Sequence, residues 1–371
     1  MDFDFSDDQK FFKTEARKFL DARSPVSVVR GVLNDDAVSY DKDLWAALGE
    51  QGWLGAAIPE AYGGLGLGHL ELCVIAEELG RSLAPTPFSS TVYFVAEALM
   101  LAGSEAQKQA WLPKIALGET IGCFATVERA GTLTEAQVTA KVEGGKLTGV
   151  KVPVTDGDVA DVAVVLAKDG GQTRLYLVDL AGPGVTRETL TTLDPTRGVA
   201  RLTFAGAACE PLGEAGEGLS LAQAVLDRAA VLLAFEQVGG ADRALEMAVD
   251  YAKNRYAFGR AIGSYQAIKH KLADMYIKTE LARSNAYYGA WALSTGAAEL
   301  PLAAAAARVA ACEAFWYAAK ENLQTHGGMG YTWEVDCHLY YRRSQQLGLV
   351  AGGAKAWKER LVSQLERRNA A

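Results

Sequence analysis

The first 120 residues carry hydrophobic positions at intervals of three and four, a spacing that is typical of α-helices. Ser6 to Gln9 read SDDQ, a capping box that places Asp7 and Asp8 favourably at a helix N-terminus. Proline, glycine and serine separate the later helical segments. The predicted helices span residues 42–50, 70–81, 90–102 and 105–116. We therefore expect a helical domain over residues 1–120.

From about residue 121 the chain changes to short segments rich in valine, threonine, leucine and tyrosine, which favour β-strands. The pairs Gly144–Gly145 and Gly170–Gly171 supply tight turns between successive strands. The predicted strands span residues 138–145, 146–154, 160–169, 173–180 and 200–208. These hairpin turns indicate an antiparallel β-domain over residues 121–213.

Helical spacing returns at Gly218 and continues to the C-terminus. Long helices are predicted over residues 219–255, 265–295, 301–326 and 337–369. Because the connections between them are short, we expect an antiparallel four-helix bundle over residues 214–371. The sequence thus predicts an α+β protein with an N-terminal helical domain, a middle β-domain and a C-terminal bundle.

Composition narrows the classes of partner. Half of the residues are hydrophobic and 22% are charged, as in an ordinary globular protein. The formal net charge of −8 argues against nucleic acid, whose binding needs a basic stripe. The N-terminus has no signal-peptide pattern, and no uninterrupted apolar stretch is long enough to span a membrane. We expect a cytoplasmic protein that binds neither nucleic acid nor membrane.

Cysteine and histidine spacing predicts neither disulfides nor a metal site. The cysteines are odd in number and scattered, and the histidines lack metal-ligand spacing. The cysteines are Cys73, Cys123, Cys209, Cys312 and Cys337, and the histidines are His69, His270, His326 and His338. The glycine-rich stretch Gly63 to Gly68, GGLGLG, follows no predicted strand, so a surface loop is a better interpretation than a nucleotide loop.

Two glycine-containing segments interrupt the C-terminal helical pattern. The first, residues 255–266, reads RYAFGRAIGSYQ and begins with Arg255, whose planar guanidinium suits a pyrophosphate. The second, residues 324–331, reads QTHGGMGY, and its glycines let the backbone approach a flat ligand closely. Either segment alone is more simply a helix end with its cap glycine. Together they indicate a surface for a large, flat, phosphorylated cofactor.

These segments and two others resemble the acyl-CoA dehydrogenase family. R-x-x-F-G-x-x-I-x-x-x-Q followed by Q-x-x-G-G-x-G-Y matches the C-terminal half of that family. GWLGAAIPEAYGGLGLG (52–68) and AEELGRSLAPTP (76–87) are similar to its N-terminal domain. FATVERAGT (124–132) stands where the family has its flavin-facing loop T-E-x-x-A-G-S. The resemblance implies a helix, sheet and bundle order, FAD as cofactor and an acyl-CoA thioester as substrate.

The resemblance also implies a FAD site formed with a neighbouring subunit. Six residues would contact the pyrophosphate and adenine end of FAD, in the family largely that of the neighbour. They are Arg255, Phe258, Gln266, Gln324, Gly327 and Gly328.

Near the flavin ring the match is weaker. Thr126 and Thr155 match the family's threonines. Val127 stands where the loop motif has glutamate, Leu133 where it often has aspartate, and Pro153 where better-known members have tryptophan. The ring contacts are therefore predicted to have changed.

The catalytic base of the family is predicted to be absent. Dehydrogenation between Cα and Cβ needs a carboxylate to take the α-proton while the flavin takes a hydride. The family's Y-E-G-T segment reads VAGG at 350–353, so Ala351 replaces the glutamate, and Ala229 occupies the alternative base position. Gly353 and Lys355 replace the following T-x-Q, which meets the adenine in the family. Glu236 lies about two helical turns, roughly 10 Å, from Ala229, too far to take the same proton unless the substrate binds in a different pose. A structural role is therefore the better interpretation of Glu236.

Three functions fit this pattern. The first is the base-less subunit of a heteromeric acyl-CoA dehydrogenase that completes a FAD site for a base-bearing homologue. Bacterial enzymes that act on steroid side chains resemble it, and residues 332–343 and 354–361 are most similar to that branch. The second is a self-sufficient flavoenzyme of monooxygenase or desulfinase type, which needs no α-proton removed. The third is a non-catalytic binding or scaffold protein.

The alanine-rich helix at 300–319 bears on assembly. Its apolar stripe is wider than one helix needs for its own core, and the family buries this region in a tetramer. We expect a heterotetramer with two base-bearing partners, and the resemblance implies electron-transferring flavoprotein as the acceptor. In the simpler interpretation, these alanines fill the core of a monomeric bundle.

Overall fold

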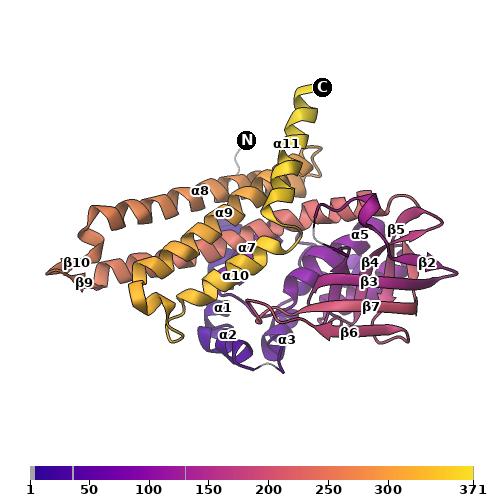
Figure 1. Cartoon of the computed structure of the whole chain (residues 1–371), viewed down its shortest axis with the longest axis horizontal. Coiled ribbons are helices and arrows are strands. Elements are labelled where there is room, and N and C mark those ends of the chain that lie inside the picture. The colour runs from indigo at the N-terminus through magenta and orange to yellow at the C-terminus, as the bar shows by residue number, and fades with distance from the viewer. Residues whose placement is uncertain (1–4, 36, 130, 371) are drawn as a thin grey trace. The chain divides into compact units, whose positions relative to one another are not determined.

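The computed structural model describes residues 5–35, 37–129 and 131–370 (Figure 1). The chain forms two compact units, each assembled from separate stretches of sequence. The helical unit comprises Met1–Val29, Cys73–Ala84 and Ala230–Ala371. The sheet unit comprises Arg30–Leu72 and Pro85–Ala229.

Local capping signals set the helices of the first third of the chain. Ser6 and Gln9 form the predicted capping box of α1 (Asp7–Arg23), and Ser104 and Gln107 form another at the start of α6 (Glu105–Ala116). The Asp41 carboxylate accepts from Leu44 N at 2.7 Å and caps α3 (Lys42–Glu50). The remaining helices are α2 (Val26–Leu33), α4 (His69–Arg81), η3 (Ser89–Ala96) and α5 (Glu97–Ala102). The predicted helix at 90–102 is in fact a π-helix, η3, that continues into α5.

An eight-stranded sheet organises the sheet unit, in the order β6-β7-β3-β2-β4-β5-β8, with β1 paired to β4. The glycine pairs at 144–145 and 170–171 have positive φ and turn the chain in the predicted places. The strands are β1 (Gly122–Ala125), β2 (Lys141–Glu143), β3 (Lys146–Thr155), β4 (Val162–Asp169), β5 (Gln172–Asp179), β6 (Val185–Thr189), β7 (Val199–Ala208) and β8 (Glu210–Leu212).

The sheet is mixed, whereas the hairpin turns had predicted an antiparallel one. β1 and β2 both run parallel to β4, because neither is joined to β4 by a hairpin. β1, β6 and β8 were not predicted as strands. They are three to five residues long, and β6 is polar and almost fully exposed.

Long helices build the helical unit: α7 (Gly218–Asn254), α8 (Gln266–Ser294), α9 (Leu300–His326), α10 (Cys337–Leu349) and α11 (Ala354–Ala370). Figure 1 shows α8, α9 and α10 running roughly side by side, with α11 set at an angle to them. The predicted helix at 337–369 is divided at residues 350–353, where Ala351 and Gly352 have φ of 62° and 99°. Left-handed backbone cannot continue an α-helix, so α10 ends there.

α4 and α7 cross with their backbones in contact. A Cβ built on Gly80 would lie 1.8 Å from the Glu236 carbonyl oxygen, and one on Gly239 would lie 1.8 Å from the Glu77 carbonyl oxygen. No side chain fits at either position. These two glycines therefore set the closeness of the central helix pair.

The alanines of α9 are used inside the helical unit. Ala303, Ala307, Ala311 and Ala318 are fully buried there, as are most other small residues of that helix. The stripe that had indicated an interface between chains thus fills the core of this unit, as the simpler interpretation had it. Among the exposed apolar side chains of this unit, Tyr276, Ile277 and Leu281 lie close together on α8.

α7 differs from expectation in its apolar length. Among the described residues it is the one helix long and apolar enough to cross a membrane, although no such stretch had been expected. Its most apolar window is 61% buried within the structure, as in a core helix.

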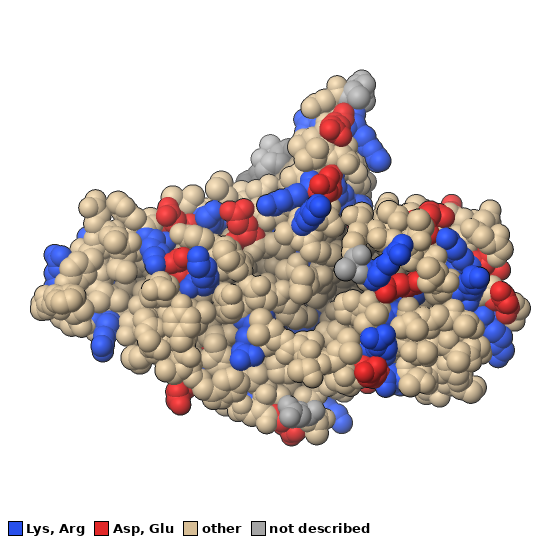
Figure 2. Space-filling model, in the orientation of Figure 1, with Lys and Arg blue, Asp and Glu red and all other residues tan. Residues whose placement is uncertain are grey.

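Figure 2 shows acidic and basic side chains interspersed on the face in view.

Candidate functional site

The turn after α7 presents an unpaired cation. The backbone of Arg255 is fixed on both sides, since its N–H donates to Tyr251 O at 2.8 Å and its carbonyl accepts from Ile262 N at 2.8 Å. Its guanidinium is exposed and has no hydrogen bond or ion pair within the described part of the chain. It is therefore free to bind a phosphate oxygen.

An exposed aromatic ring follows at the tip of the hairpin formed by β9 (Tyr256–Ala257) and β10 (Arg260–Ala261). Phe258 has φ of 53° and its side chain is 97% exposed. Burying an exposed ring is favourable, so this geometry suits contact with a flat ligand or another chain. Gln266, the first residue of α8, is also exposed, and its amide has no partner among the described residues.

The glycine segment at the end of α9 leaves an open backbone surface. A Cβ on Gly327 or Gly328 would meet nothing within 4 Å, and Gly327 has φ of 60°. Exposed Gln324 accepts from the Tyr331 hydroxyl at 3.4 Å. Their backbone is thus accessible to a ligand from outside.

Tyr251 joins these two segments. Its ring stacks on His326 at 4.1 Å between centroids, and its hydroxyl donates to Met329 Sδ at 3.6 Å. Since Arg255 follows one turn later, the ends of α7 and α9 form one surface of the helical unit. Among the described residues, this surface carries the unpaired cation Arg255, the exposed ring of Phe258, the unpaired amide of Gln266 and the open backbone at Gly327 and Gly328, which are the features expected for the pyrophosphate and adenine end of FAD. Arg255, Phe258, Gln266, Gln324 and Gly328 are exposed, and Gly327 is half-buried.

The two threonines expected near the flavin ring belong to the sheet unit. Thr126 follows β1 and is buried, and Thr155 ends β3 and is half-buried. Val152 N donates to Val127 O at 2.9 Å and joins the two segments that carry them. The structure thus places these threonines on neighbouring segments.

Glu128, which the motif comparison missed, supplies a carboxylate in the same loop. It accepts from Lys151 Nζ at 2.7 Å, from Ala140 N at 3.0 Å and from the N–H and hydroxyl of Thr139. Burial alone raises the pKa of Glu128, but these hydrogen bonds outweigh it and lower the pKa. Burial lowers the pKa of Lys151, whose side chain is fully enclosed. Its partner Lys151 is 23 residues away in the sequence, so no local motif indicates this contact.

Neither predicted base position carries a titratable group. Ala229 is fully buried in α7, and Ala351 lies in the left-handed turn between α10 and α11. Glu236 is also buried, and its carboxylate lies 4.0 Å from Nη1 of Arg343. Arg343 donates from its other nitrogen to Leu83 O at 3.3 Å. Glu236 thus belongs to an interior ion pair.

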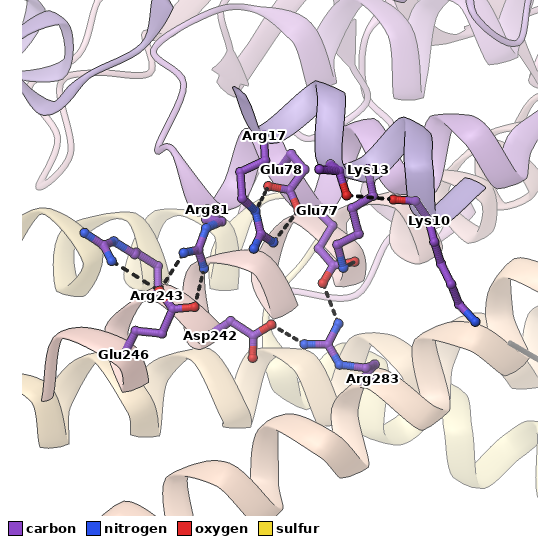
Figure 3. A network of polar contacts seen from close by, with 11 residues as sticks. Lys10, Lys13, Arg17, Glu77, Glu78, Arg81, Asp242, Arg243, Glu246 and Arg283 are labelled. Carbon is purple, nitrogen blue, oxygen red and sulfur yellow. Dashed lines mark hydrogen bonds and ion pairs between the residues drawn. The ribbon is translucent and has the colours of Figure 1, made fainter. Parts of the chain in front are cut away.

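A larger ion network attaches α1 to the other helices of its unit (Figure 3). The buried Glu77 carboxylate contacts Lys13 at 2.7 Å and Arg283, which also binds Asp242. Burial raises the pKa of Glu77, but the two cations outweigh it and lower the pKa. Burial dominates at Asp242, whose pKa is raised. The network is thus an arrangement of mutually paired charges.

A hollow of about 340 Å³ lies at one end of this network. Arg81, Arg243 and Tyr340 line it. Glu246 already pairs with Arg81 at 2.5 Å and with Arg243 at 3.1 Å, and the Tyr340 hydroxyl donates to Arg81 O at 2.9 Å. Arg81 and Arg243, the cations that line the hollow, are therefore already paired with a carboxylate, whereas, among the described residues, Arg255 is not. Across residues 5–35, 37–129 and 131–370, no cluster of histidine, cysteine and carboxylate side chains could hold a metal ion, and all five cysteines are free thiols.

Comparison with known proteins assigns the family. The acyl-CoA dehydrogenase N-terminal domain model matches residues 6–119 and the C-terminal domain model matches residues 216–364. Acyl-CoA dehydrogenase IpdE2 of Mycobacterium tuberculosis is 36% identical over 344 residues, which are 91% of each chain.

Two solved structures share the fold. A chain of the ChsE4-ChsE5 complex of Mycobacterium tuberculosis has a TM-score of 0.88 at 29% identity, and the match covers 99% of this chain and 99% of that one. The Tcur3481-Tcur3483 steroid ACAD, solved as a variant, has a TM-score of 0.87 at 29% identity, covering 98% of this chain and 99% of that one. The predicted fold of N-terminal helices, middle sheet and C-terminal helices is confirmed. The chain belongs to the acyl-CoA dehydrogenase family, whose members are FAD flavoproteins.

Proposed function

We propose that this chain is the subunit of a heteromeric acyl-CoA dehydrogenase that lacks the catalytic glutamate and completes a FAD site for a base-bearing homologous partner. One observation carries the proposal. The surface for the adenine end, centred on Arg255 and the 327–328 glycines, is exposed and unpaired, whereas Ala229 and Ala351 cannot take a proton. A chain that keeps a cofactor surface for its neighbour but no base of its own fits a shared site.

In this proposal the residues divide by chemistry. Arg255 holds the pyrophosphate through charge-assisted hydrogen bonds, while Phe258, Gln266 and Gln324 contact the adenine end. Gly327 and Gly328 allow the backbone to approach the same end.

On the ring side, Thr126 and Thr155 would donate hydroxyl hydrogen bonds. The contact of Glu128 with Lys151 joins the two segments that carry these threonines. When bound, FAD accepts the hydride from the acyl thioester. The glutamate that takes the α-proton belongs to the partner subunit.

The proposal includes the setting of the reaction. The two-component ChsE4-ChsE5 complex and the steroid ACAD among the similar structures support a heteromeric enzyme in steroid degradation. We place the enzyme in the cytoplasm as a heterotetramer, with electron-transferring flavoprotein as the electron acceptor. We further propose that the present chain has three domains, at residues 1–120, 121–213 and 214–371.

Co-expression with a base-bearing homologue tests the proposal. We expect the purified complex to show a flavin absorbance spectrum and to oxidise acyl-CoA with an artificial electron acceptor. The chain alone should turn over very poorly, because both base positions are alanine. Robust turnover by the chain alone would overturn the proposal in favour of a self-sufficient flavoenzyme. A chain that binds no FAD with any homologous partner would instead be a non-catalytic protein.

A further inference from the structure

Arg308 is a fully buried cation in the middle of α9. No carboxylate lies within ion-pair distance of it in the described parts of the chain. Desolvating a guanidinium is costly, so neutral acceptors must stabilise it. The acceptors that bind the Arg308 guanidinium therefore show which parts of the chain it holds in place.

The acceptors lie on two other helices. Arg308 donates from Nη1 to Gln237 Oε1 on α7 at 2.5 Å. From Nη2 it donates to Val350 O at 2.6 Å and to Leu347 O, at the end of α10. The last carbonyls of a helix have no intrahelical partner and carry the negative end of its dipole. Arg308 therefore caps α10 from inside the helical unit.

The bond to Val350 fixes the chain next to Ala351. Ala351 has φ of 62° and Gly352 has φ of 99°. The indole N–H of Trp357 donates to Ala351 O at 3.0 Å. The carbonyls on either side of the Ala351 Cα are thus each held by a buried side chain, Arg308 and Trp357. The backbone of this turn is therefore anchored on both sides of residue 351.

We propose that Arg308 is the positioning residue of the α10–α11 turn. It fixes the backbone of residue 351, the position at which base-bearing relatives carry their glutamate. It thereby fixes the surface of this chain that contacts the acyl group of the substrate. The part that concerns the acyl group rests on the proposed function. Arginine suits this task because its planar fork reaches acceptors on two helices at once, which a single ammonium does not.

Hydrogen–deuterium exchange of the Arg308→Lys variant tests the positioning step without reference to activity. We expect amides in residues 346–353 to exchange at least tenfold faster, with exchange in α8 unchanged. Arg343→Lys is the matched control, because Arg343 is equally buried on α10 but contacts Glu236 and Leu83. Equal acceleration in all helices, or the same turn-specific change in the control, would overturn the proposal.

If Arg308→Lys does not fold, Gln237→Met weakens the same contact from its other end. It must then raise exchange in the same peptide, and an unchanged peptide would refute the proposal. In the assembled enzyme, Arg308→Lys should raise KM for acyl-CoA at least threefold, with kcat and FAD content unchanged. An unchanged KM would remove the role toward the acyl group. A wild-type assembly without FAD or turnover would refute the proposed function, and exchange would still decide the positioning step.

Discussion

At the scale of single residues, candidate site residues that belong to a motif could be predicted from the sequence. Residues that contact one another only in the folded sheet could not. Arg255, Phe258 and Gln266 were identified by type and spacing, and the structure leaves all three exposed. The contact of Glu128 with Lys151 joins residues 23 apart in sequence, and only folding brings them together. Spacing along the chain reports local geometry, whereas such pairs depend on sheet register.

Arg255→Ala should reduce FAD retention in the assembled protein by at least tenfold. The variant loses charge-assisted hydrogen bonds worth about 1.5–3 kcal/mol each. Arg255→Lys should rescue binding only in part, because an ammonium lacks the planar fork. Flavin absorbance per chain after gel filtration measures the effect. Arg260→Ala is the control, since that exposed cation already stacks on Tyr265 at 3.9 Å. Unchanged FAD content in Arg255→Ala would place the cofactor surface elsewhere.

Ala351→Gly should stabilise the protein by about 0.5–1 kcal/mol. Left-handed backbone costs an L-residue roughly 1–2 kcal/mol, and the added freedom of glycine in the unfolded chain returns about 0.4–1 kcal/mol of this. Urea unfolding of the two proteins gives the difference. Ala356→Gly, within α11, should instead destabilise by about 0.5–1 kcal/mol. Destabilisation of both variants alike would mean that the turn at 351 is not strained.

At the scale of elements, capped helices were predicted to the residue, as at 42–50 and 105–116. The break at 350–353 was missed although Gly352–Gly353 is the same kind of turn signal as Gly144–Gly145; only the left-handed conformation of Ala351 has no signature in the sequence. The parallel pairing of β1 and β2 with β4 was missed as well. Non-local pairing is set by the packing of the whole sheet, which hairpin turns do not report.

The loop around Glu128 should lose stability in acid. Because hydrogen bonds lower the folded-state pKa of this carboxyl from 4.5, its contribution is full above that value and is lost as pH falls through the folded pKa. At pH 7, Glu128→Gln should cost about 3 kcal/mol, because it leaves Lys151 buried without its partner. Urea titrations from pH 7 to pH 3.5 compare the variant with wild type. A difference in unfolding free energy that stays constant below pH 4.5 would contradict this assignment.

Gly80→Ala should disrupt the α4–α7 crossing. The new Cβ would lie 1.8 Å from the Glu236 carbonyl oxygen, so backbone must move, at a cost of about 3 kcal/mol or more. Gly31→Ala in α2 is the control. Its Cβ meets nothing within 4 Å, and it should stabilise by about 0.5–1 kcal/mol. Thermal unfolding distinguishes the two, and similar melting temperatures would show that the crossing tolerates a side chain.

At the scale of the whole molecule, the order of helices, sheet and bundle followed from local periodicity, but the way the chain assembles did not. The alanines of α9 suggested an interface, and they are instead the core of the helical unit. Amphipathic spacing shows that one face of a helix is buried. It does not show whether that face packs in the core of its own chain or against another chain.

The exposed apolar residues of α8 support the last prediction, that the chain is an obligate oligomer. Tyr276, Ile277 and Leu281 are 57%, 54% and 59% exposed, and Ile277 and Leu281, four residues apart, lie on the same face of that helix. Large exposed apolar patches mark protein–protein contact sites, and this face of α8 is the candidate for one. With its partner we expect a heterotetramer, and alone a homodimer or homotetramer.

Light scattering should therefore give a multiple of 39.5 kDa at micromolar concentration. Leu281→Asp should shift the mass toward the monomer and release FAD, because a charge buried at an interface is costly and the adenine-end surface serves a neighbour. Leu193→Asp, at a leucine of the sheet unit that is 51% exposed, should change neither mass nor FAD content. A monodisperse wild-type monomer that still holds FAD would remove the shared site, since Arg255 and the open glycines would then have no neighbour to serve.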